Sequence, residues 1–399
     1  MKNKKYIEIV LILCGLSAAS VGICINSQGV FYAPMAESLG VYRGSVAMYQ
    51  TLYTLSLAVS SIIAPKILND NNFKKIVSIS IIVTFFSILL TAFTRSLTII
   101  YILSIIRGIA TSFFNIVILT IVVNGWFIEN RGIVSSIILA VAGVVGAIFS
   151  PVFTFLINTF NWETAYIANA SVVLLFCLPF LIFPISIKAE YLNYEPYGKK
   201  EDVVTKETNK EFKYASISYL AIVLFSFLIT ATNGVTANMP GYAESIGVGS
   251  YVGASMVSAV MIANIISKLL IGYISDKYNA FKANIIMLII FMVGIIGLVF
   301  ASNKLPLIVL SFIFGFVYSV TALGVAFISR ELFGDNNYKK SFPIVSFAGS
   351  VGSALSISLI GYLYDFTGTY KTVFYIFTVI GLVCISLLLL ANNKEKNRQ

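Results

Sequence analysis

The sequence predicts an all-α membrane protein with twelve transmembrane helices, arranged as two pseudo-symmetric six-helix bundles. Three observations predict this fold class: the composition, the number of long apolar segments, and an internal repeat. Of the 399 residues, 58% are hydrophobic and 11% are charged, and the mean hydropathy is +0.91. Because soluble domains carry about a quarter charged residues, the composition excludes a water-soluble enzyme, a nucleic-acid binder and a disordered regulator.

Twelve segments are apolar over the roughly twenty residues that a membrane-spanning helix needs. They lie at about 7–34, 45–68, 75–93, 97–125, 132–158, 163–187, 215–239, 249–274, 282–301, 305–329, 341–363 and 370–391. Short polar turns separate most of them, whereas residues 188–214 form a longer hydrophilic stretch with several charges and no apolar period. We therefore expect an N-terminal bundle over 1–187, a linker over 188–214 and a C-terminal bundle over 215–399.

The distribution of positive charge predicts the orientation. With a cytoplasmic N-terminus, 21 of the 27 Lys and Arg residues fall in the segments on the inner side of the membrane and 4 on the outer side. This asymmetry predicts a multi-pass protein of the cell membrane whose two termini and linker are cytoplasmic. It also explains the net charge of +10, so no nucleic-acid partner is needed to account for that charge.

The two halves of the sequence repeat one another at an offset of 206 or 207 residues. Four pairs show this offset: Pro34 with Pro240, Asp70 with Asp276, Phe127 with Phe333, and the Gly143–Gly146 segment with Gly349–Gly352. Parallel repeats of this kind are typical of transporters that bind substrate near the bilayer midplane and work by alternating access.

The most specific local motif is Gly272-Tyr273-Ile274-Ser275-Asp276-Lys277. It resembles the Gly-x-x-x-Asp-Arg/Lys signature of the major facilitator superfamily, between spans eight and nine. The resemblance covers the whole chain and implies the major facilitator fold with a cytoplasmic gate at Gly272, Asp276, Lys277 and Asp70. Gly272 would allow close helix approach, and Asp276 would pair with a cation or face a helix N-terminus. In the first half, Asp70 is present but Lys66 occupies the glycine position.

A second set of motifs is similar to the oxalate:formate antiporter and monocarboxylate transporter branch of that superfamily. The motifs are Trp126-Phe127-Ile128-Glu129-Asn130-Arg131-Gly132, Gly29-Val30-Phe31 with Pro34, and Gln50-Thr51 before Tyr53-Thr54-Leu55. This resemblance implies transport of small carboxylates.

Two cations lie within predicted spans, whereas none of the 17 acidic residues lies at mid-membrane. Arg107 is in span four, and Lys268 is in span eight, eight residues before Asp276 and so about 12 Å from that edge. Because intramembrane charge is costly, each is a candidate functional residue. A positive cavity without an acid predicts an anionic substrate, since a carboxylate accepts hydrogen bonds from Arg and Lys. Snorkelling of Lys268, and a structural or coupling role for Arg107, are the alternatives.

The resemblance to the carboxylate branch implies a cation in span eight, and Lys268 matches it. Asn264, one turn earlier on the same helix face, stands where some relatives carry a proton-accepting aspartate. The family's oxalate exchangers also hold a lysine in span eleven, which Phe347-Ala348-Gly349 lacks. Both departures argue against oxalate specificity and against proton coupling by that route.

Other polar residues at depth are weaker candidates for substrate contact. Each of them could equally make an interhelical hydrogen bond, worth about 0.6 kcal/mol in membranes. Thr111 and Asn115 continue the face of Arg107 at helical spacing, and the family match strengthens Gln50. The set consists of Gln50, Asn26, Tyr318, Asn115, Gln28, Tyr53 and Asn233.

The sequence thus predicts a secondary or facilitative transporter, acting as a monomer, for a small organic anion. Exchange or facilitated diffusion fits the lack of intramembrane acids. The alternative is an efflux pump for amphipathic compounds. An enzyme is not expected, because the chain has no histidine, no mid-membrane acid and no phosphate-binding loop. We expect no cofactor and no metal.

Overall fold

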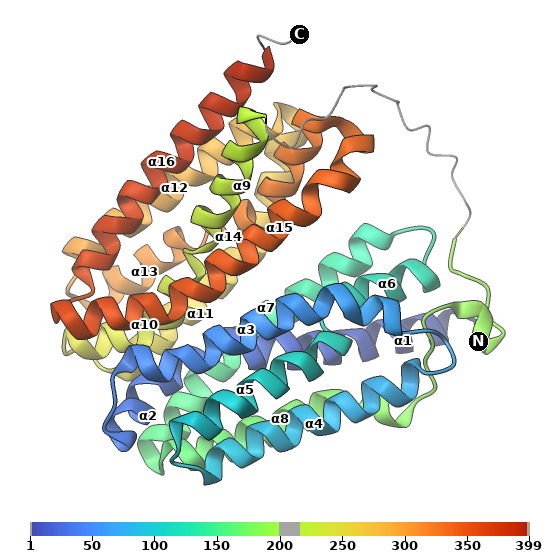
Figure 1. Cartoon of the computed structure of the whole chain (residues 1–399), viewed down its shortest axis with the longest axis horizontal. Coiled ribbons are helices and arrows are strands. Elements are labelled where there is room, and N and C mark those ends of the chain that lie inside the picture. Colours follow the sequence, from blue (N-terminus) through green and yellow to red (C-terminus); the bar gives the residue numbers. More distant parts are fainter. Residues whose placement is uncertain (1, 199–215, 397–399) are drawn as a thin grey trace. The chain divides into compact units, whose positions relative to one another are not determined.

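A computed structural model of the chain describes residues 2–198 and 216–396, and it is helical almost throughout (Figure 1). Within these residues, twelve helices are long and apolar enough to cross a membrane. They are Lys4–Leu39, Arg43–Ile67, Phe73–Phe93, Leu97–Trp126, Arg131–Thr159, Trp162–Ile182, Ile217–Ser245, Ser250–Lys277, Ala280–Phe300, Lys304–Gly334, Ser341–Thr367 and Lys371–Asn392. Each matches one predicted span, so the predicted twelve-helix fold is confirmed.

The helices group into two compact units of six spans each. Of the described residues, unit 1 holds 2–41 and 48–198, and unit 2 holds 42–47 and 216–396. The elements of unit 1 are α1 (Lys2–Ser17), the π-helix η1 (Ala18–Asn26), η2 (Gln28–Phe31), α2 (Tyr32–Leu39), α3 (Arg43–Ile67), α4 (Phe73–Phe93), α5 (Leu97–Thr111), η3 (Ser112–Phe114), α6 (Ile116–Trp126), α7 (Arg131–Thr159), α8 (Trp162–Ile182) and η4 (Ala189–Leu192). The first residues of α3 belong to unit 2.

Unit 2 repeats the order of unit 1. Its elements are α9 (Ile217–Thr230), α10 (Asn233–Ser245), α11 (Ser250–Lys277), α12 (Ala280–Phe300), α13 (Lys304–Phe314), α14 (Val317–Ser319), the π-helix η5 (Val320–Gly324), α15 (Val325–Thr367) and α16 (Lys371–Lys396). Within α15, Gly334 has φ 73° and ψ 164° and separates the tenth span from the eleventh.

The first and fourth spans of each unit are broken near their middle. In unit 1 the breaks fall at η1–η2 and at η3, and in unit 2 they fall between α9 and α10 and between α13 and α15. Broken helices expose backbone groups that side chains or ligands must satisfy, and transporters place their binding sites at such breaks. The breaks therefore mark where a site should be sought in each unit.

Glycines that correspond in the repeat make corresponding close contacts. A Cβ at Gly146 of α7 would lie 2.6 Å from the Asn26 Cβ of the first span, and a Cβ at Gly352 of α15 would overlap the Phe227 carbonyl of the seventh. Likewise, a Cβ at Gly108 would overlap the Tyr53 carbonyl. At these glycines the helices pack closely, because the absence of a side chain lets their backbones approach one another.

Substitution of Gly108 should destabilise unit 1. Gly108→Ala would press a methyl group against the backbone of α3, and overpacking of this kind typically costs about 1–3 kcal/mol. We expect a lower Tm and less monodisperse protein on size-exclusion chromatography in detergent. Gly272→Ala is the matched control, because a Cβ there meets nothing within 4 Å. Equal Tm values for the two variants would contradict the packing role of Gly108.

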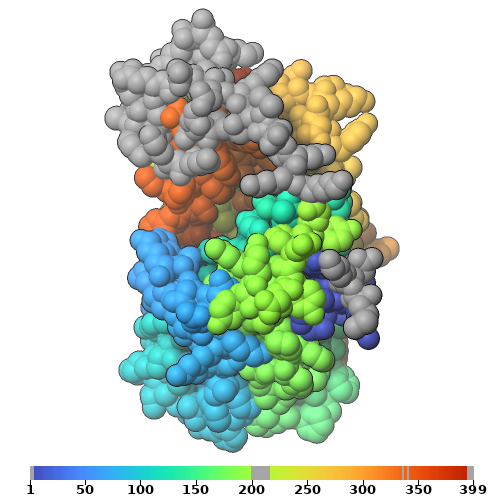
Figure 2. All heavy atoms as spheres, turned by 90° about the vertical axis from the view of Figure 1, so that its right-hand side faces the viewer, coloured from blue at the N-terminus to red at the C-terminus, as the bar shows by residue number. Residues whose placement is uncertain are grey.

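The predicted linker begins as an ordered part of unit 1. The Lys188 N–H donates to Asp70 Oδ1 at 3.0 Å, the Tyr191 hydroxyl donates to Asn71 Oδ1 at 2.8 Å, and the Tyr197 N–H donates to the Trp126 carbonyl at 2.8 Å. Figure 2 shows this stretch in lime green beside the blue turn between α3 and α4. The rest of the predicted linker, residues 199–214, lies outside the described residues, so the predicted boundary stays a prediction there.

Candidate functional site

The central feature of unit 1 is Arg107, which lies on α5 and is 2% exposed. Two fully buried tyrosines of α3 present their rings to it. The guanidinium carbon lies 4.6 Å from the ring centroid of Tyr53 and 5.6 Å from that of Tyr49. Tyr49 and Tyr53 are four residues apart, so both rings lie on one face of α3. The close approach of α5 to α3 at Gly108 brings Arg107 against this face.

Among the described residues, one side chain forms a hydrogen bond with the Arg107 guanidinium. The Arg107 Nη2 donates to Gln50 Oε1 at 3.3 Å, whereas the buried Nε has no partner in this part of the chain. None of the carboxylates in the described part of the chain forms an ion pair with Arg107. We call Arg107, Tyr49, Gln50 and Tyr53 the Arg107 cage.

The broken first span holds the cage in place. Gln50 Nε2 donates to the Cys24 carbonyl at 3.0 Å, and the Tyr53 hydroxyl donates to the Ser20 carbonyl at 3.4 Å. Both carbonyls belong to the π-helix η1, and Cys24 is near its end, where helical carbonyls lack backbone partners. Gln50 therefore joins the end of η1 to the guanidinium.

Gln28 orients one tyrosine of the cage, Tyr49, by a hydrogen bond. Its Oε1 accepts hydrogen bonds from the Tyr49 and Tyr166 hydroxyls, both at 3.2 Å, and its Nε2 donates to the Ile23 carbonyl at 2.8 Å. Tyr49 is thus oriented by a buried amide. The hydroxyl of Tyr32, whose ring packs edge-on against Tyr49 at 5.7 Å, is buried without a partner.

The cage satisfies the Arg107 charge only in part. Burying a cation in a protein costs several kcal/mol even after relaxation. A cation–π contact returns about 0.5–2 kcal/mol, and a hydrogen bond to a charged group returns about 1.5–3 kcal/mol. Two rings and one long hydrogen bond leave the guanidinium without an anionic partner, and its Nε without an acceptor, among the described residues. A carboxylate supplies both the missing charge and the missing acceptor.

In unit 2, Lys268 and Asn264 lie one turn apart on α11. Lys268 is partly buried and has no hydrogen bond or ion pair with any described residue. Asn264 is 9% exposed, and its Oδ1 has no partner. The neighbouring Ser267 hydroxyl donates to the Asn264 carbonyl at 3.2 Å and so is not directed at Lys268. Arg107 and Lys268 belong to different units.

The weaker candidates differ in their surroundings. Asn26 Nδ2 donates to the Ala142 carbonyl at 3.3 Å, which is the packing role left open for it. Asn115 Oδ1 is buried and unpartnered, but α5 ends at Thr111, and Asn115 has extended backbone before α6. The expectation that Thr111 and Asn115 continue one helical face with Arg107 is therefore wrong beyond Thr111. Tyr318 lies on the short helix α14, in the break of the tenth span.

The predicted gate residues are not equivalent in the two units. Asp70 accepts the Lys188 N–H at 3.0 Å, whereas Asp276 is exposed and has no partner among the described residues. Lys277 stacks on Tyr273 at 5.9 Å. A Cβ at Gly272 would meet no described residue within 4 Å, so the close approach expected there is not found in the described part of the chain.

A carboxylate that the sequence analysis missed occupies the start of α12. Glu331 Oε2 accepts the Ala280 N–H at 2.7 Å. This is the helix N-terminal contact that was expected of Asp276, because negative groups are stabilised near helix N-termini. Glu331 lies three residues before Gly334, where the tenth span ends. This position near the end of a span could have signalled a contact with a neighbouring turn.

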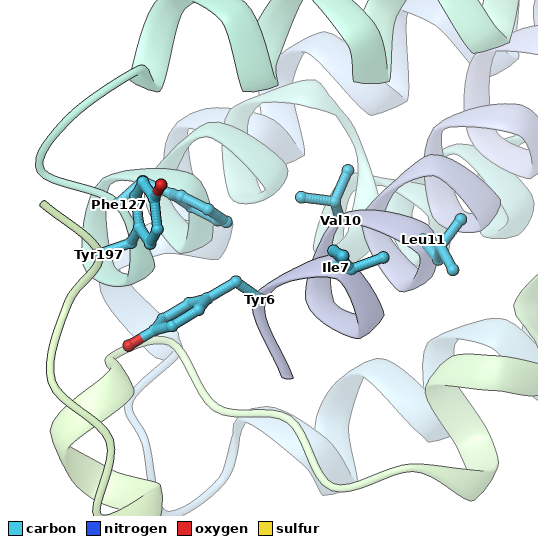
Figure 3. Close-up of a pocket in the computed structure, with 6 residues that line it drawn as sticks. All are labelled: Tyr6, Ile7, Val10, Leu11, Phe127 and Tyr197. Carbon is cyan, nitrogen blue, oxygen red and sulfur yellow. The ribbon is translucent and has the colours of Figure 1, made fainter. Parts of the chain in front are cut away.

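A separate pocket of about 340 Å³ opens on the surface of unit 1 (Figure 3). Its lining residues are Tyr6, Ile7, Val10, Leu11, Phe127 and Tyr197. The Tyr6 ring packs edge-on against Tyr197, with centroids 5.3 Å apart. None of the six lining residues is charged, so this pocket does not offer the chemistry that an anion requires.

Comparisons with known proteins agree with this architecture. The family model described as Major Facilitator Superfamily matches residues 14–322 and, in a second match, 221–399. Monocarboxylate transporter 12 of Homo sapiens is 24% identical over 281 residues, which cover 63% of this chain and 54% of the relative. The Xenopus laevis protein of the same name is 26% identical over 69% of this chain and 65% of the relative. The matches thus span between half and two thirds of these relatives.

A bacterial relative matches over more of its length, and solved structures match the fold. The uncharacterized MFS-type transporter YhjX of Escherichia coli is 24% identical over 82% of this chain and 81% of the relative. The nucleoside transporter NupG has a TM-score of 0.70 at 15% identity, covering 96% of this chain and 98% of NupG. A D-xylose-proton symporter has a TM-score of 0.70 at 14% identity, covering 96% of both chains. The chain therefore belongs to the Major Facilitator Superfamily.

Proposed function

We propose that this protein is a membrane transporter and that it carries a small organic anion, a monocarboxylate or a dicarboxylate. The observation that carries the proposal is Arg107, a cation that is 2% exposed and has no carboxylate partner among the described residues. Its unpartnered Nε offers a donor to a carboxylate oxygen. The substrate would supply the charge that the protein leaves out.

The relatives named monocarboxylate transporter support this substrate class. The nucleoside and sugar transporters share the fold at 15% identity or less, and fold alone does not determine substrate. A buried, unpaired guanidinium is poorly suited to an uncharged sugar, because the desolvation cost of the cation would remain uncompensated.

Lys268 provides a second cation for the same substrate class. It lies in the eighth span, about 12 Å before Asp276 at 1.5 Å per residue, and has no ion pair with a described residue. The adjacent Asn264 Oδ1 is unpartnered, so its amide can orient a bound anion.

Transport would proceed by alternating access, as in other transporters with parallel repeats. Substrate biases the equilibrium only if its contacts differ between the inward-facing and outward-facing states. Exchange or facilitated diffusion fits the lack of acids at mid-membrane in the sequence. The excess of Lys and Arg in alternate loops favours an orientation with both termini cytoplasmic, in the cell membrane.

Uptake into proteoliposomes tests the substrate class. Purified protein is reconstituted and given radiolabelled lactate, formate or oxalate, with protein-free liposomes as the control. We expect saturable uptake that is accelerated when unlabelled carboxylate is preloaded inside. If no carboxylate is taken up while an amphipathic dye is exported, the protein is an efflux pump and the proposal is wrong.

A further inference from the structure

Gln50 links the backbone of the first span to the guanidinium of Arg107 in unit 1. Its Nε2 donates to the Cys24 carbonyl at 3.0 Å, near the end of the π-helix η1, and its Oε1 accepts from Arg107 Nη2 at 3.3 Å. The side chain is 1% exposed, so it is fixed from both sides. Gln50 therefore sets where the guanidinium lies relative to the first span.

The group that accepts the hydrogen bond from Arg107 is the neutral amide of Gln50, at a place where a carboxylate would also fit. A glutamate has nearly the same shape as glutamine and would face Arg107 as a charged partner. In the present chain the acceptor is an amide, which fixes the position of the guanidinium but does not neutralise it. The Arg107 Nε also remains unpartnered.

We infer that Gln50 is a positioning residue whose neutrality keeps the Arg107 charge available to the transported anion. This inference deepens the proposed function and rests on it. Gln50 would act through Arg107, by holding the guanidinium against Tyr49 and Tyr53 and leaving Nε for a carboxylate oxygen. The π-helical break of the first span contributes the carbonyl that holds Gln50 itself.

The variant Gln50→Glu separates positioning from charge. The new carboxylate would lose the hydrogen bond to the Cys24 carbonyl but gain an ion pair with a buried cation that had none. Because Arg107 is already buried without a carboxylate among the described residues, and an uncompensated buried charge is strongly destabilising, we expect the new ion pair to give a higher Tm without substrate. We also expect anion uptake to fall by at least about tenfold, since the substrate must displace an internal partner.

Asn284→Asp is the matched control for this chemical change. Asn284 is also fully buried, and its Nδ2 also donates to a backbone carbonyl, that of Ala280, at 2.8 Å. No ion pair joins a cation to this position among the described residues. The same amide-to-carboxylate change should therefore lower the Tm at Asn284 and raise it at Gln50.

A double variant tests whether the effect runs through Arg107. In an Arg107→Gln background, Gln50→Glu leaves a buried carboxylate without its cation, so the gain in Tm should disappear and become a loss. If Gln50→Glu lowers the Tm in the wild-type background, or raises it equally in both backgrounds, the new carboxylate does not pair with Arg107 and the inference is wrong.

The experiment combines the Tm of purified full-length protein with the Tm shift caused by sodium lactate, formate or oxalate. The inference predicts that Gln50→Glu raises the Tm and abolishes the carboxylate-induced shift. If the Tm rises but the shift and the uptake persist, the inference is overturned while anion transport stands. If the wild-type protein itself neither takes up nor responds to any of the three carboxylates, the proposed function fails, and the inference falls with it.

Discussion

Arg107→Gln should reduce carboxylate uptake by roughly 30-fold or more. Removing one partner of a buried, hydrogen-bonded charge pair costs about 2–5 kcal/mol, and each 1.4 kcal/mol is about tenfold in affinity. Because no carboxylate of the described residues forms an ion pair with Arg107, its removal strands none of them. The Tm of the variant without substrate should therefore stay near that of the wild type. Uptake into proteoliposomes and the Tm of the same preparation measure the two effects.

The control for Arg107 is a cation at the surface of the same unit. The Arg95 side chain is 77% exposed, and its Nη2 lies 3.7 Å from Glu163 Oε1. Exposed ion pairs contribute about 0–1 kcal/mol, so Arg95→Gln should change neither uptake nor Tm appreciably. If Arg107→Gln keeps its uptake and only lowers the Tm, then Arg107 has a structural role and is not the anchor of the anion.

Lys268→Ala should weaken carboxylate binding by about tenfold or more. A lysine at mid-depth of a span is energetically costly, so its presence there points to a function. Loss of a charge-assisted hydrogen bond between Lys268 and the substrate would cost about 1.5–3 kcal/mol. The effect should appear as a raised KM in proteoliposomes and as a smaller Tm shift with carboxylate. Lys268→Arg keeps the charge and should restore a large part of the binding.

Lys282→Ala is the matched control for Lys268. Lys282 lies on the first turn of α12, with its Nζ 6.0 Å from the Tyr278 ring centroid. Its loss should leave the KM unchanged. A carboxylate-induced Tm shift that survives Lys268→Ala unchanged would show that Lys268 snorkels or packs and does not hold the substrate.

The twelve spans were predictable because the lipid bilayer restricts which sequences can cross it. A helix in lipid must satisfy all its backbone groups internally, so spans appear as long apolar segments. What the sequence did not reveal were the breaks within spans. Residues 97–125 look like one helix, whereas the chain forms α5, η3 and α6 there. No proline marks this break, but Asn115 is the N-cap of α6, a position that asparagine favours, and this was a signal that the sequence analysis did not use.

The members of the cage were only partly predictable. Arg107 and Gln50 were separate candidates, but their hydrogen bond joins residues 57 positions apart and depends on how α5 packs on α3. Tyr49 and Tyr166 were missed, although the spacing of Tyr49 and Tyr53 marks an aromatic face of one helix. Gln28 was a candidate for substrate contact, and the structure assigns it to two tyrosine hydroxyls.

The repeat preserves packing but not charge. Gly108 approaches the Tyr53 carbonyl, and Gly315, 207 residues later, would bring a Cβ to 2.8 Å from the Val260 carbonyl, also 207 residues later. At the same offset, Phe314 stands where the first half has Arg107, and Ser61 stands where the second half has Lys268. Neither cation is therefore repeated in the other half, whereas the close glycine contact is.

The central claim is that the transporter lacks a negative charge that its substrate supplies. A matched pair of ligands tests it most directly: lactate and lactamide, which have nearly the same size and differ in charge. The Tm of purified wild-type protein is measured with each ligand at equal concentration and ionic strength. We expect a saturable Tm shift with lactate and no shift with lactamide. The same contrast is expected between a larger carboxylate and its own amide. Equal shifts with carboxylate and amide would contradict the central claim.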